Sequence, residues 1–182
     1  MKNLKAPRRA RGKGFTLSEL LIVIAIIAIL AIIIIVAINP GAMIAKSRDS
    51  QRFSDVTSLA TAVNLFLADS QTISNGGPFK STDGLTDNDR KKNDGTGWIK
   101  DLDFRVVTSG APIASLPIDP TNDGALHYVF GANTIAKTYE IDSKFENSEN
   151  KQKQLSDGGN SNTGEGIYEV GTDLTILGDG DY

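Results

Sequence analysis

Residues Leu20 to Ile38 read LLIVIAIIAILAIIIIVAI, nineteen residues without a polar side chain. As an α-helix with a rise of about 1.5 Å per residue, this segment is about 28 Å long, close to the roughly 30 Å hydrocarbon core of a bilayer. A helix that is apolar all round cannot be a surface helix of a small soluble domain, so lipid or other protein must surround it. The segment therefore predicts a helix that spans a membrane or lies in a packed protein core.

The residues before this segment are strongly basic. Residues 1–14 contain six basic residues and no acid: Lys2, Lys5, Arg8, Arg9, Arg11 and Lys13. By the positive-inside rule, we expect this leader to stay on the cytoplasmic side and the rest of the chain to lie outside the membrane. The other 168 residues contain 13 basic residues and all 22 acids, a net charge of −9. This acidic balance argues against general nucleic-acid binding through phosphate neutralisation.

Two ordinary membrane signals compete as interpretations of the apolar segment. A secretory signal peptide has an apolar stretch of about 7–15 residues followed by an Ala-x-Ala-like cleavage site. Here the stretch is longer and is followed by Asn39-Pro40-Gly41, which disfavours that interpretation. A plain signal anchor that holds an extracellular domain on the membrane is the default from hydropathy alone.

The entrance to the apolar segment carries more information than its length. Glu19 is an ionisable group at the start of the helix, in the sequence Gly14-Phe15-Thr16-Leu17-Ser18-Glu19. A carboxylate in the first turn suits the helix dipole, and that is the structural interpretation. Ionisable residues within spanning helices are costly and usually functional. A capping role also leaves Gly14 unexplained.

The local pattern KGFTLSELLIVIAIIAILA, from Lys13 to Ala31, resembles the class III signal of type IV pilins and type II secretion pseudopilins, and the match extends over residues 12–38. The resemblance implies that a membrane prepilin peptidase cuts after Gly14. It implies that Phe15 becomes a methylated N-terminus and that Glu19 is the carboxylate used in subunit assembly. It also implies an assembly machinery and a homo-oligomeric helical filament as partners.

The assembly role of Glu19 has an independent physical basis. In a core of packed apolar helices, a free amine and a carboxylate are each costly when unpaired. If the Phe15 amine of one subunit meets Glu19 of its neighbour, each group removes the other's penalty. A misregistered helix would leave a buried charge unpaired, so the pair would fix the register of the subunits.

A second helix is expected after the apolar one. Pro40 and Gly41 interrupt the pattern and either end the first helix or kink it. Apolar residues at helical spacing follow, namely Val56, Leu59, Val63 and Phe66, and the charged residues Arg48, Asp49, Arg52 and Asp55 lie on the preceding turns at spacings that allow ion pairs within the helix. We expect a helix over about residues 42–69, joined to the first through a kink. This arrangement matches pilin architecture.

The remainder of the chain predicts a loop followed by a small sheet. Residues 70–97 are rich in glycine, asparagine and aspartate, and they include the basic triplet Arg90-Lys91-Lys92, which we interpret as solvated. Short runs with β-branched and aromatic residues follow, at Phe104–Thr108, Leu126–Phe130, Thr138–Ile141, Ile167–Val170 and Leu174–Leu177. An antiparallel sheet packed on the second helix gives an α+β fold. The stretch Leu116-Pro117-Ile118-Asp119-Pro120 adds a weaker resemblance to pilin and pseudopilin heads.

These expectations divide the chain into five segments. They are a basic leader at 1–14, a transmembrane or filament-core helix at 15–38, an amphipathic helix at 39–69, a loop region at 70–97, and a β-sheet head with an acidic C-terminal region at 98–182.

The composition excludes several kinds of site. The chain has no cysteine and one histidine, so disulfides, thiolate metal sites and a Cys–His nucleophile are excluded, and we expect no enzymatic activity. His127 is interpreted as a structural histidine whose hydrogen bonds are satisfied, and Trp98 as a core or edge aromatic. After Lys153 come six acids and no basic residue: Asp157, Glu165, Glu169, Asp173, Asp179 and Asp181. We expect no cofactor and a solvated acidic region, with a calcium site between Asp157 and Asp181 as the alternative.

The sequence thus favours a structural subunit of a type IV pilus or a type II secretion-like pseudopilus. It would be held in the cytoplasmic membrane by one span before assembly and would lie in a cell-surface or periplasmic filament afterwards. Close approach of Ala25, Ala28 and Ala31 would help the helices pack. The alternative is a non-assembling, membrane-anchored binding protein, either an adhesin or a competence-type minor pilin that binds DNA.

Overall fold

The computed structural model describes residues 14–84, 86–159, 166–178 and 180–182. The chain divides into two units, residues 1–40 and residues 41–182. The basic residues of the leader lie outside the described part. The α+β class expected from the sequence is confirmed, with helical segments over residues 17–68 followed by a small antiparallel sheet.

The first unit contains helix α1 (Leu17–Ile38). Thr16 is its N-cap, and none of its residues is buried. One helical segment of the described chain, near its N-terminus, is long and apolar enough to cross a membrane. Asn39 follows α1 with a left-handed backbone (φ 47°), and Pro40 then begins the next helix, where a missing N–H has no cost. The interruption expected at Pro40 and Gly41 therefore falls at Asn39.

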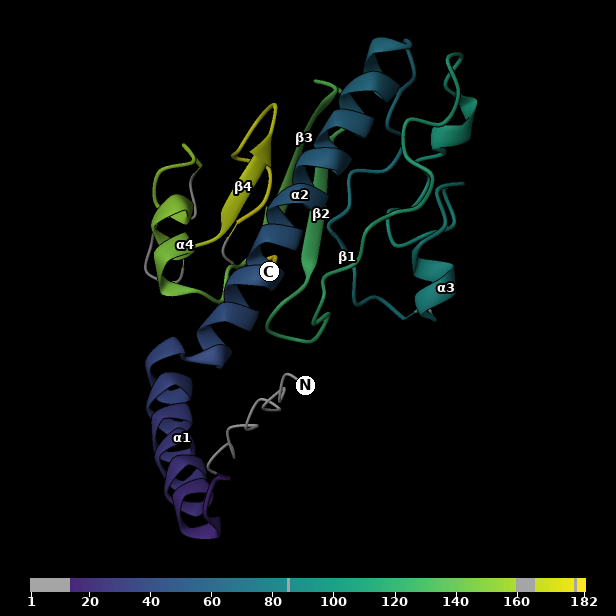
Figure 1. The fold of residues 1–182 in the computed structure, drawn as a ribbon. Coiled ribbons are helices and arrows are strands. Elements are labelled where there is room, and N and C mark those ends of the chain that lie inside the picture. The colour runs from purple at the N-terminus through teal and green to yellow at the C-terminus, as the bar shows by residue number, and fades with distance from the viewer. Residues whose placement is uncertain (1–13, 85, 160–165, 179) are drawn as a thin grey trace, which may run out of the picture. The chain divides into compact units, whose positions relative to one another are not determined.

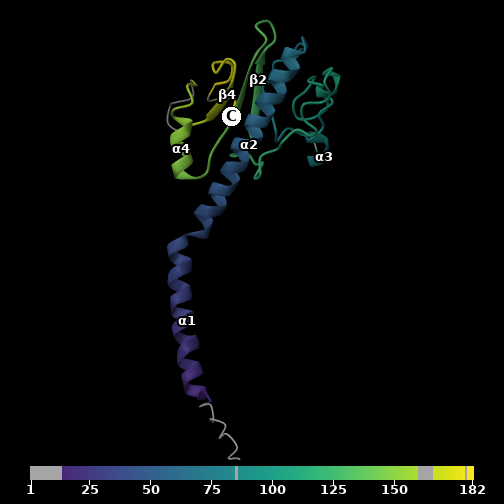
Figure 2. The same ribbon diagram turned by 45° about the horizontal axis from the view of Figure 1, so that its top comes forward.

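The second unit is built on helix α2 (Pro40–Ala68) and a four-stranded sheet. The strands β1 (Phe79–Lys80), β2 (Tyr128–Asn133), β3 (Thr138–Ser143) and β4 (Tyr168–Gly171) pair in chain order, all antiparallel. Helix α2 lies along one face of this sheet in both views (Figures 1 and 2). The short helix α3 (Asp87–Arg90) belongs to the segment beyond β1, and α4 (Ser148–Gln154) lies beside β4.

The core lies between α2 and the sheet. The apolar positions predicted from the helical spacing, Val56, Leu59, Val63 and Phe66, are all buried there. From the sheet, the Tyr139 hydroxyl donates a hydrogen bond to the Ala60 carbonyl of α2 (3.0 Å). Trp98 is fully buried, as expected of a core aromatic, and its indole N–H donates to the Pro117 carbonyl (2.8 Å).

The strand predictions were right for three of the five runs. Phe104–Thr108 is wrong: a 3₁₀ helix covers Phe104–Val106, and the Asp103 side chain caps it by accepting from the Arg105 N–H. Leu174–Leu177 is also wrong, because the N–H groups of Ile176 and Leu177 donate to a side chain instead of to a strand. Strand β1 and helix α3 lie in the 70–97 segment that was expected to be a loop, and α4 was not predicted.

Candidate functional site

The N-terminal motif forms a capping box at the start of α1. The Thr16 side chain accepts from the Glu19 N–H (3.2 Å), and a Glu19 carboxylate oxygen accepts from the Thr16 N–H (2.9 Å) and from the Thr16 hydroxyl (2.8 Å). Two of the free N–H groups at the helix start are satisfied in this way. The carboxylate of Glu19 therefore has a local role within its own chain, as the dipole argument expects, and it is also exposed.

The residues expected at the processing site precede this cap and are open to approach. Gly14 is exposed, and an added Cβ there would meet no atom within 4 Å. Phe15 is 86% exposed, although its ring is large and apolar. Gly14, Phe15 and Glu19 therefore lie in one short segment at the N-terminal end of the apolar helix α1.

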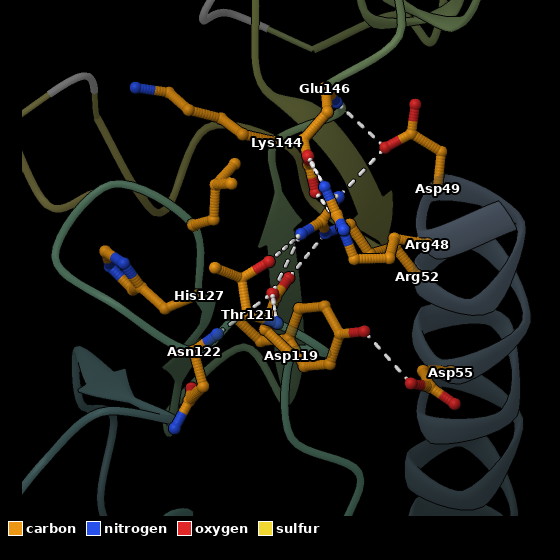
Figure 3. A network of polar contacts seen from close by, with 12 residues as sticks. Arg48, Asp49, Arg52, Asp55, Asp119, Thr121, Asn122, His127, Lys144 and Glu146 are labelled. Carbon is orange, nitrogen blue, oxygen red and sulfur yellow. Dashed lines mark hydrogen bonds and ion pairs between the residues drawn. The ribbon is translucent and has the colours of Figure 1, made fainter. Parts of the chain in front are cut away.

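A second polar arrangement lies where α2 meets the head, around the fully buried guanidinium of Arg52 (Figure 3). It donates twice to the Asp119 carboxylate (2.6 and 2.9 Å), and one further nitrogen donates to Asp49 (2.9 Å) and Glu146 (2.7 Å). A buried cation needs this many partners to offset its lost hydration. Thr121 accepts a further hydrogen bond from the guanidinium (3.1 Å). We call Arg52 with Asp49, Asp119 and Glu146 the arginine network.

The arginine network joins segments that are distant in sequence. Asp119 comes from the Leu116–Pro120 stretch, and the same carboxylate accepts from the Thr121 N–H (2.7 Å). Asp49 of α2 accepts from the Glu146 and Asn147 N–H groups (2.8 Å each), just before α4 begins. The sequence predicted ion pairs within α2, and Arg52–Asp49 is one, but the longer-range pairs were missed. The network fixes the head on α2, which is a structural role.

Glu146 makes the network sensitive to acid. The guanidinium of Arg48 donates hydrogen bonds to the Glu146 carboxylate, and together with Arg52 it lowers the pKa of Glu146 to about 2. A lowered pKa stabilises the fold above the ordinary glutamate value of about 4.3, and this contribution is lost as the pH falls toward 2.

We expect Glu146→Gln to destabilise the head by about 1–3 kcal/mol at pH 7, because it removes charge-assisted hydrogen bonds. The difference in stability between this variant and the wild type should shrink as the pH falls from 5 to 2.5, because protonation of Glu146 removes the same stabilisation from the wild type. Thermal midpoints measured over this pH range check the expectation, with the exposed Glu149→Gln as control. Parallel curves for wild type and Glu146→Gln would contradict it.

A third arrangement lies on the sheet face that points away from α2. Glu140 and Asp142 of β3 and Glu169 of β4 are all buried, and one oxygen of each lies within 4.8 Å of the others. We call these three residues the carboxylate cluster. Asp142 and Glu169 are direct cross-strand partners, and the alternation along β3 places Glu140 on the same face as Asp142.

Burial and mutual repulsion disturb the ionisation of this cluster. Burial, with the neighbouring carboxylates, raises the pKa of Asp142 to about 9. Burial also raises the pKa of Glu140 to about 7, although the N–H groups of Leu177 and Ile176 that donate to it act in the other direction. These are the described residues that could hold a metal ion.

The cluster overlaps only partly with the acidic region singled out from the sequence. Glu169 belongs to both, and Asp157 lies nearby, accepting from the Glu169 N–H (2.9 Å). Asp173 and Asp181 accept from backbone N–H groups of their own turns, while Glu165 and Asp179 lie outside the described residues. Glu140 and Asp142 were missed. Their signal is the alternation Tyr139-Glu140-Ile141-Asp142, which places acids on one face of a strand whose other face is apolar.

Other residues considered from the sequence have structural surroundings. In the triplet at 90–92, Lys92 pairs with Asp89 (2.6 Å) and is exposed, as a solvated triplet predicts. Arg90 departs from this prediction, because its side chain is 18% exposed and pairs with Asp87 (2.6 Å). His127 is buried and stacks on Tyr182, with ring centroids 4.4 Å apart. Its Nδ1 contacts the Asp123 carbonyl (3.1 Å), while Nε2 has no hydrogen-bond partner among the described residues.

Comparison with known protein families gives a match at the N-terminal end of the chain. Residues 9–35 match the model of the prokaryotic N-terminal methylation motif, which confirms the prepilin-type signal expected from the sequence. The matched range includes Gly14, Phe15 and Glu19. No curated protein and no solved structure matches the chain.

Proposed function

From the premise that this chain carries the N-terminal signal of type IV pilin-like prepilins, we propose that it is a structural subunit of a filament, either a type IV pilus or a type II secretion-like pseudopilus. The observation that carries the proposal is α1, a helix that is apolar on every side and has no buried residue. Such a helix must be surrounded by apolar groups. Lipid supplies them before assembly, and the helices of neighbouring subunits supply them afterwards.

Processing would come first. A membrane prepilin peptidase would cut the bond after Gly14 and leave Phe15 as the new, methylated N-terminus. The exposure of both residues supports access by an enzyme. Before this cut the chain would span the cytoplasmic membrane once, with its basic leader inside.

Assembly would then exchange lipid contacts of α1 for contacts with neighbouring copies. Alanines at positions 25, 28 and 31 allow helix backbones to approach closely. Cleavage would also create a free amine on Phe15, close in sequence to the carboxylate of Glu19. Within a subunit, the Glu19 carboxylate accepts hydrogen bonds from the N–H group and the hydroxyl of Thr16. The proposed filament contact adds the neighbour's Phe15 amine as a charged partner for the same carboxylate.

The competing function is a membrane-anchored binding protein that does not assemble. Its DNA-binding form would need a basic surface, and two of the three cations at 90–92 already pair with aspartates. The net negative charge of residues 15–182 also argues against DNA binding.

Mass spectrometry of the N-terminus of the chain from its native membrane tests the proposal. We expect a mature chain that begins with methylated Phe15. Gly14→Val should leave the leader in place, because it adds a branched side chain next to the proposed scissile bond, where the wild-type chain has only a hydrogen. Gly84→Val, at another glycine with open space around it, is the matched control and should be processed normally. An intact leader on the wild-type chain, in cells with an active prepilin peptidase, would support the plain anchor instead.

A further inference from the structure

A buried histidine in the head has a ring nitrogen that neither processing nor assembly uses. His127 comes directly before β2, is 2% exposed, and stacks on the ring of Tyr182. We propose that His127 and Tyr182 form an acid-sensitive clasp, which holds residues 180–182 on the head near neutral pH and releases them when His127 gains a proton. The inference goes beyond the proposed function and does not rest on it, since both residues lie in the unit of residues 41–182.

The Tyr182 hydroxyl makes the contacts that close the clasp. It donates to the His127 carbonyl (2.6 Å) and accepts from the N–H groups of His127 (3.2 Å) and Lys144 (3.0 Å). Because β2 begins directly after His127 and β3 ends directly before Lys144, this one hydroxyl joins the ends of two strands. The hydrogen bonds of Asp181 stay within its own turn, with Gly178. The side chain of Tyr182 therefore attaches residues 180–182 to the head.

The two ring nitrogens of His127 have different surroundings. Nδ1 lies 3.1 Å from the Asp123 carbonyl oxygen, and because a carbonyl can only accept, Nδ1 carries the proton of the neutral ring. Nε2 is buried and has no hydrogen-bond partner among the described residues. The expectation of a histidine with satisfied hydrogen bonds is therefore met at Nδ1 alone. A second proton would go to Nε2, where a charged N–H group would be buried without an acceptor.

Two cations near the clasp oppose this second proton. Burial lowers the pKa of His127 most strongly, and the positive charges of Lys80 and Lys144 lower it further. The Nζ atom of Lys144 also lies 4.6 Å from the centre of the Tyr182 ring. A protonated His127 would bring a second positive charge to the same aromatic ring, so the stacked arrangement favours the neutral imidazole.

Two acids near His127 act in the opposite direction, but both have other partners. The charge of Asp119 favours protonation of His127, yet its carboxylate accepts two hydrogen bonds from the Arg52 guanidinium. The carboxylate of Asp123 accepts from two N–H groups of its own turn (2.9 and 2.8 Å). Neither carboxylate is hydrogen-bonded to Nε2. These acids therefore weaken the effect of burial and of the two cations without cancelling it.

The direction of the pH response follows from these surroundings. Release of Tyr182 opens His127 to water, where its pKa returns toward the ordinary 6.5, whereas the docked state keeps the pKa lower. The docked state therefore binds fewer protons, so the clasp is most stable above pH 6.5 and weakens as the pH falls below this value. Each pH unit below 6.5 at which docked His127 stays neutral favours release about tenfold, up to about 100-fold at pH 4.5. Glu146, with a pKa of about 2, remains ionised at that pH.

The experiment uses the full chain in detergent micelles, with a nitroxide label on residue 180. Gly180→Cys gives a unique attachment site, because the chain has no cysteine and an added Cβ there would meet no atom within 4 Å. Electron paramagnetic resonance spectra measure the ratio of mobile to immobile label. We expect this ratio to rise by about 10-fold or more between pH 7.5 and pH 4.5, with a midpoint below pH 6.5. Gly84→Cys, also in open space, is the matched control and should show no change.

Two variants, each made in the Gly180→Cys background, separate the parts of the clasp. His127→Phe keeps an aromatic ring but cannot gain a proton, so the label should stay immobile at both pH values. Tyr182→Phe keeps the stacked ring but loses the hydroxyl contacts, so the label should be mobile already at pH 7.5.

Nuclear magnetic resonance tests the clasp without replacing the histidine. The chain has one histidine, so its ring carbon gives a single signal. We expect this signal to titrate below pH 6.5 in the wild type and closer to pH 6.5 in Tyr182→Phe, where the ring is open to water. This measurement decides the matter if His127→Phe fails to fold.

Three results would overturn the inference. They are a label on residue 180 whose mobility is the same at pH 7.5 and pH 4.5, an equal rise in mobility in His127→Phe or at the Gly84→Cys control, and a His127 signal that titrates at or above pH 6.5. Processing and filament formation are not readouts here, so failure of this inference is distinguishable from failure of the proposed function.

Discussion

Replacing Glu19 by alanine is expected to leave the chain expressed, inserted in the membrane and cleaved, but to reduce filaments by on the order of 100-fold or more. The reason is that the Phe15 amine of each neighbouring subunit would enter an apolar core without a counter-charge. Electron microscopy and immunoblotting of sheared surface material, compared with the membrane fraction, measure the effect.

The capping role of Glu19 requires a separate control. Glu19→Gln keeps an oxygen that can accept from the Thr16 N–H, so the local cap survives while the charge is lost. We expect this variant to fail in assembly as the alanine variant does. Ser18→Ala, next in sequence, changes a polar neighbour of the cap without changing charge and should assemble normally. Normal filaments from Glu19→Gln would assign Glu19 to helix capping and remove its role in assembly.

Arg52→Met is expected to destabilise the head by about 3–5 kcal/mol, the largest effect on stability that the structure predicts. Methionine fills much of the volume but supplies no donors, so Asp49 and Asp119 would be left buried without their cation. In a chain of this size, such a loss lowers the thermal midpoint by roughly 6–20 °C. Circular dichroism melts of the full chain in micelles would show it.

Arg105→Met is the matched control for this experiment. Arg105 also pairs with aspartates, Asp103 at 2.9 Å and Asp94 at 3.8 Å, but its side chain is 58% exposed. Exposed ion pairs contribute little to stability, so we expect its midpoint to stay close to wild type. Similar losses in the two variants would show that the burial of Arg52, on which the prediction depends, has no special effect.

Helices α1 and α2 could be predicted from the sequence because their signals are local. The apolar run from Leu20 to Ile38 and the spacing of Val56, Leu59, Val63 and Phe66 each decide one element without reference to the rest of the chain. Strands β2, β3 and β4 were found for the same reason, since their β-branched and aromatic residues alternate within a few positions. The prepilin-type signal is also contiguous, and the family match covers it.

The missed features depend on residues that are far apart in sequence. Strand β1 consists of Phe79 and Lys80, which are recognisable only through their pairing with Phe130 and Val129. The partner of Arg52 is Asp119, 67 positions away, and no helical spacing points to it. Leu174–Leu177 has the composition of a strand, but the carboxylate of Glu140 takes two of its N–H groups.

The carboxylate cluster shows that the abundance of acids in a segment does not locate the acids that are buried. The acids after Lys153 were prominent because they are numerous, yet Asp173 and Asp181 are used in local turns. Two of the three clustered acids lie earlier, in β3, where they occupy alternate positions of a strand. Asp142 and Glu169 are 27 residues apart in sequence, and they become neighbours only through the antiparallel pairing of β3 with β4, which their spacing does not predict.

The central claim is that this chain leaves the membrane to become part of a filament. Its most direct test is to shear surface filaments from cells that make the chain at native levels, purify them, and sequence their peptides from the N-terminus. We predict that the filaments contain this chain as a repeated subunit beginning at methylated Phe15. Recovery of the chain solely from the membrane, as a monomer that still carries its basic leader while other prepilins in the same cells are processed, would contradict the account.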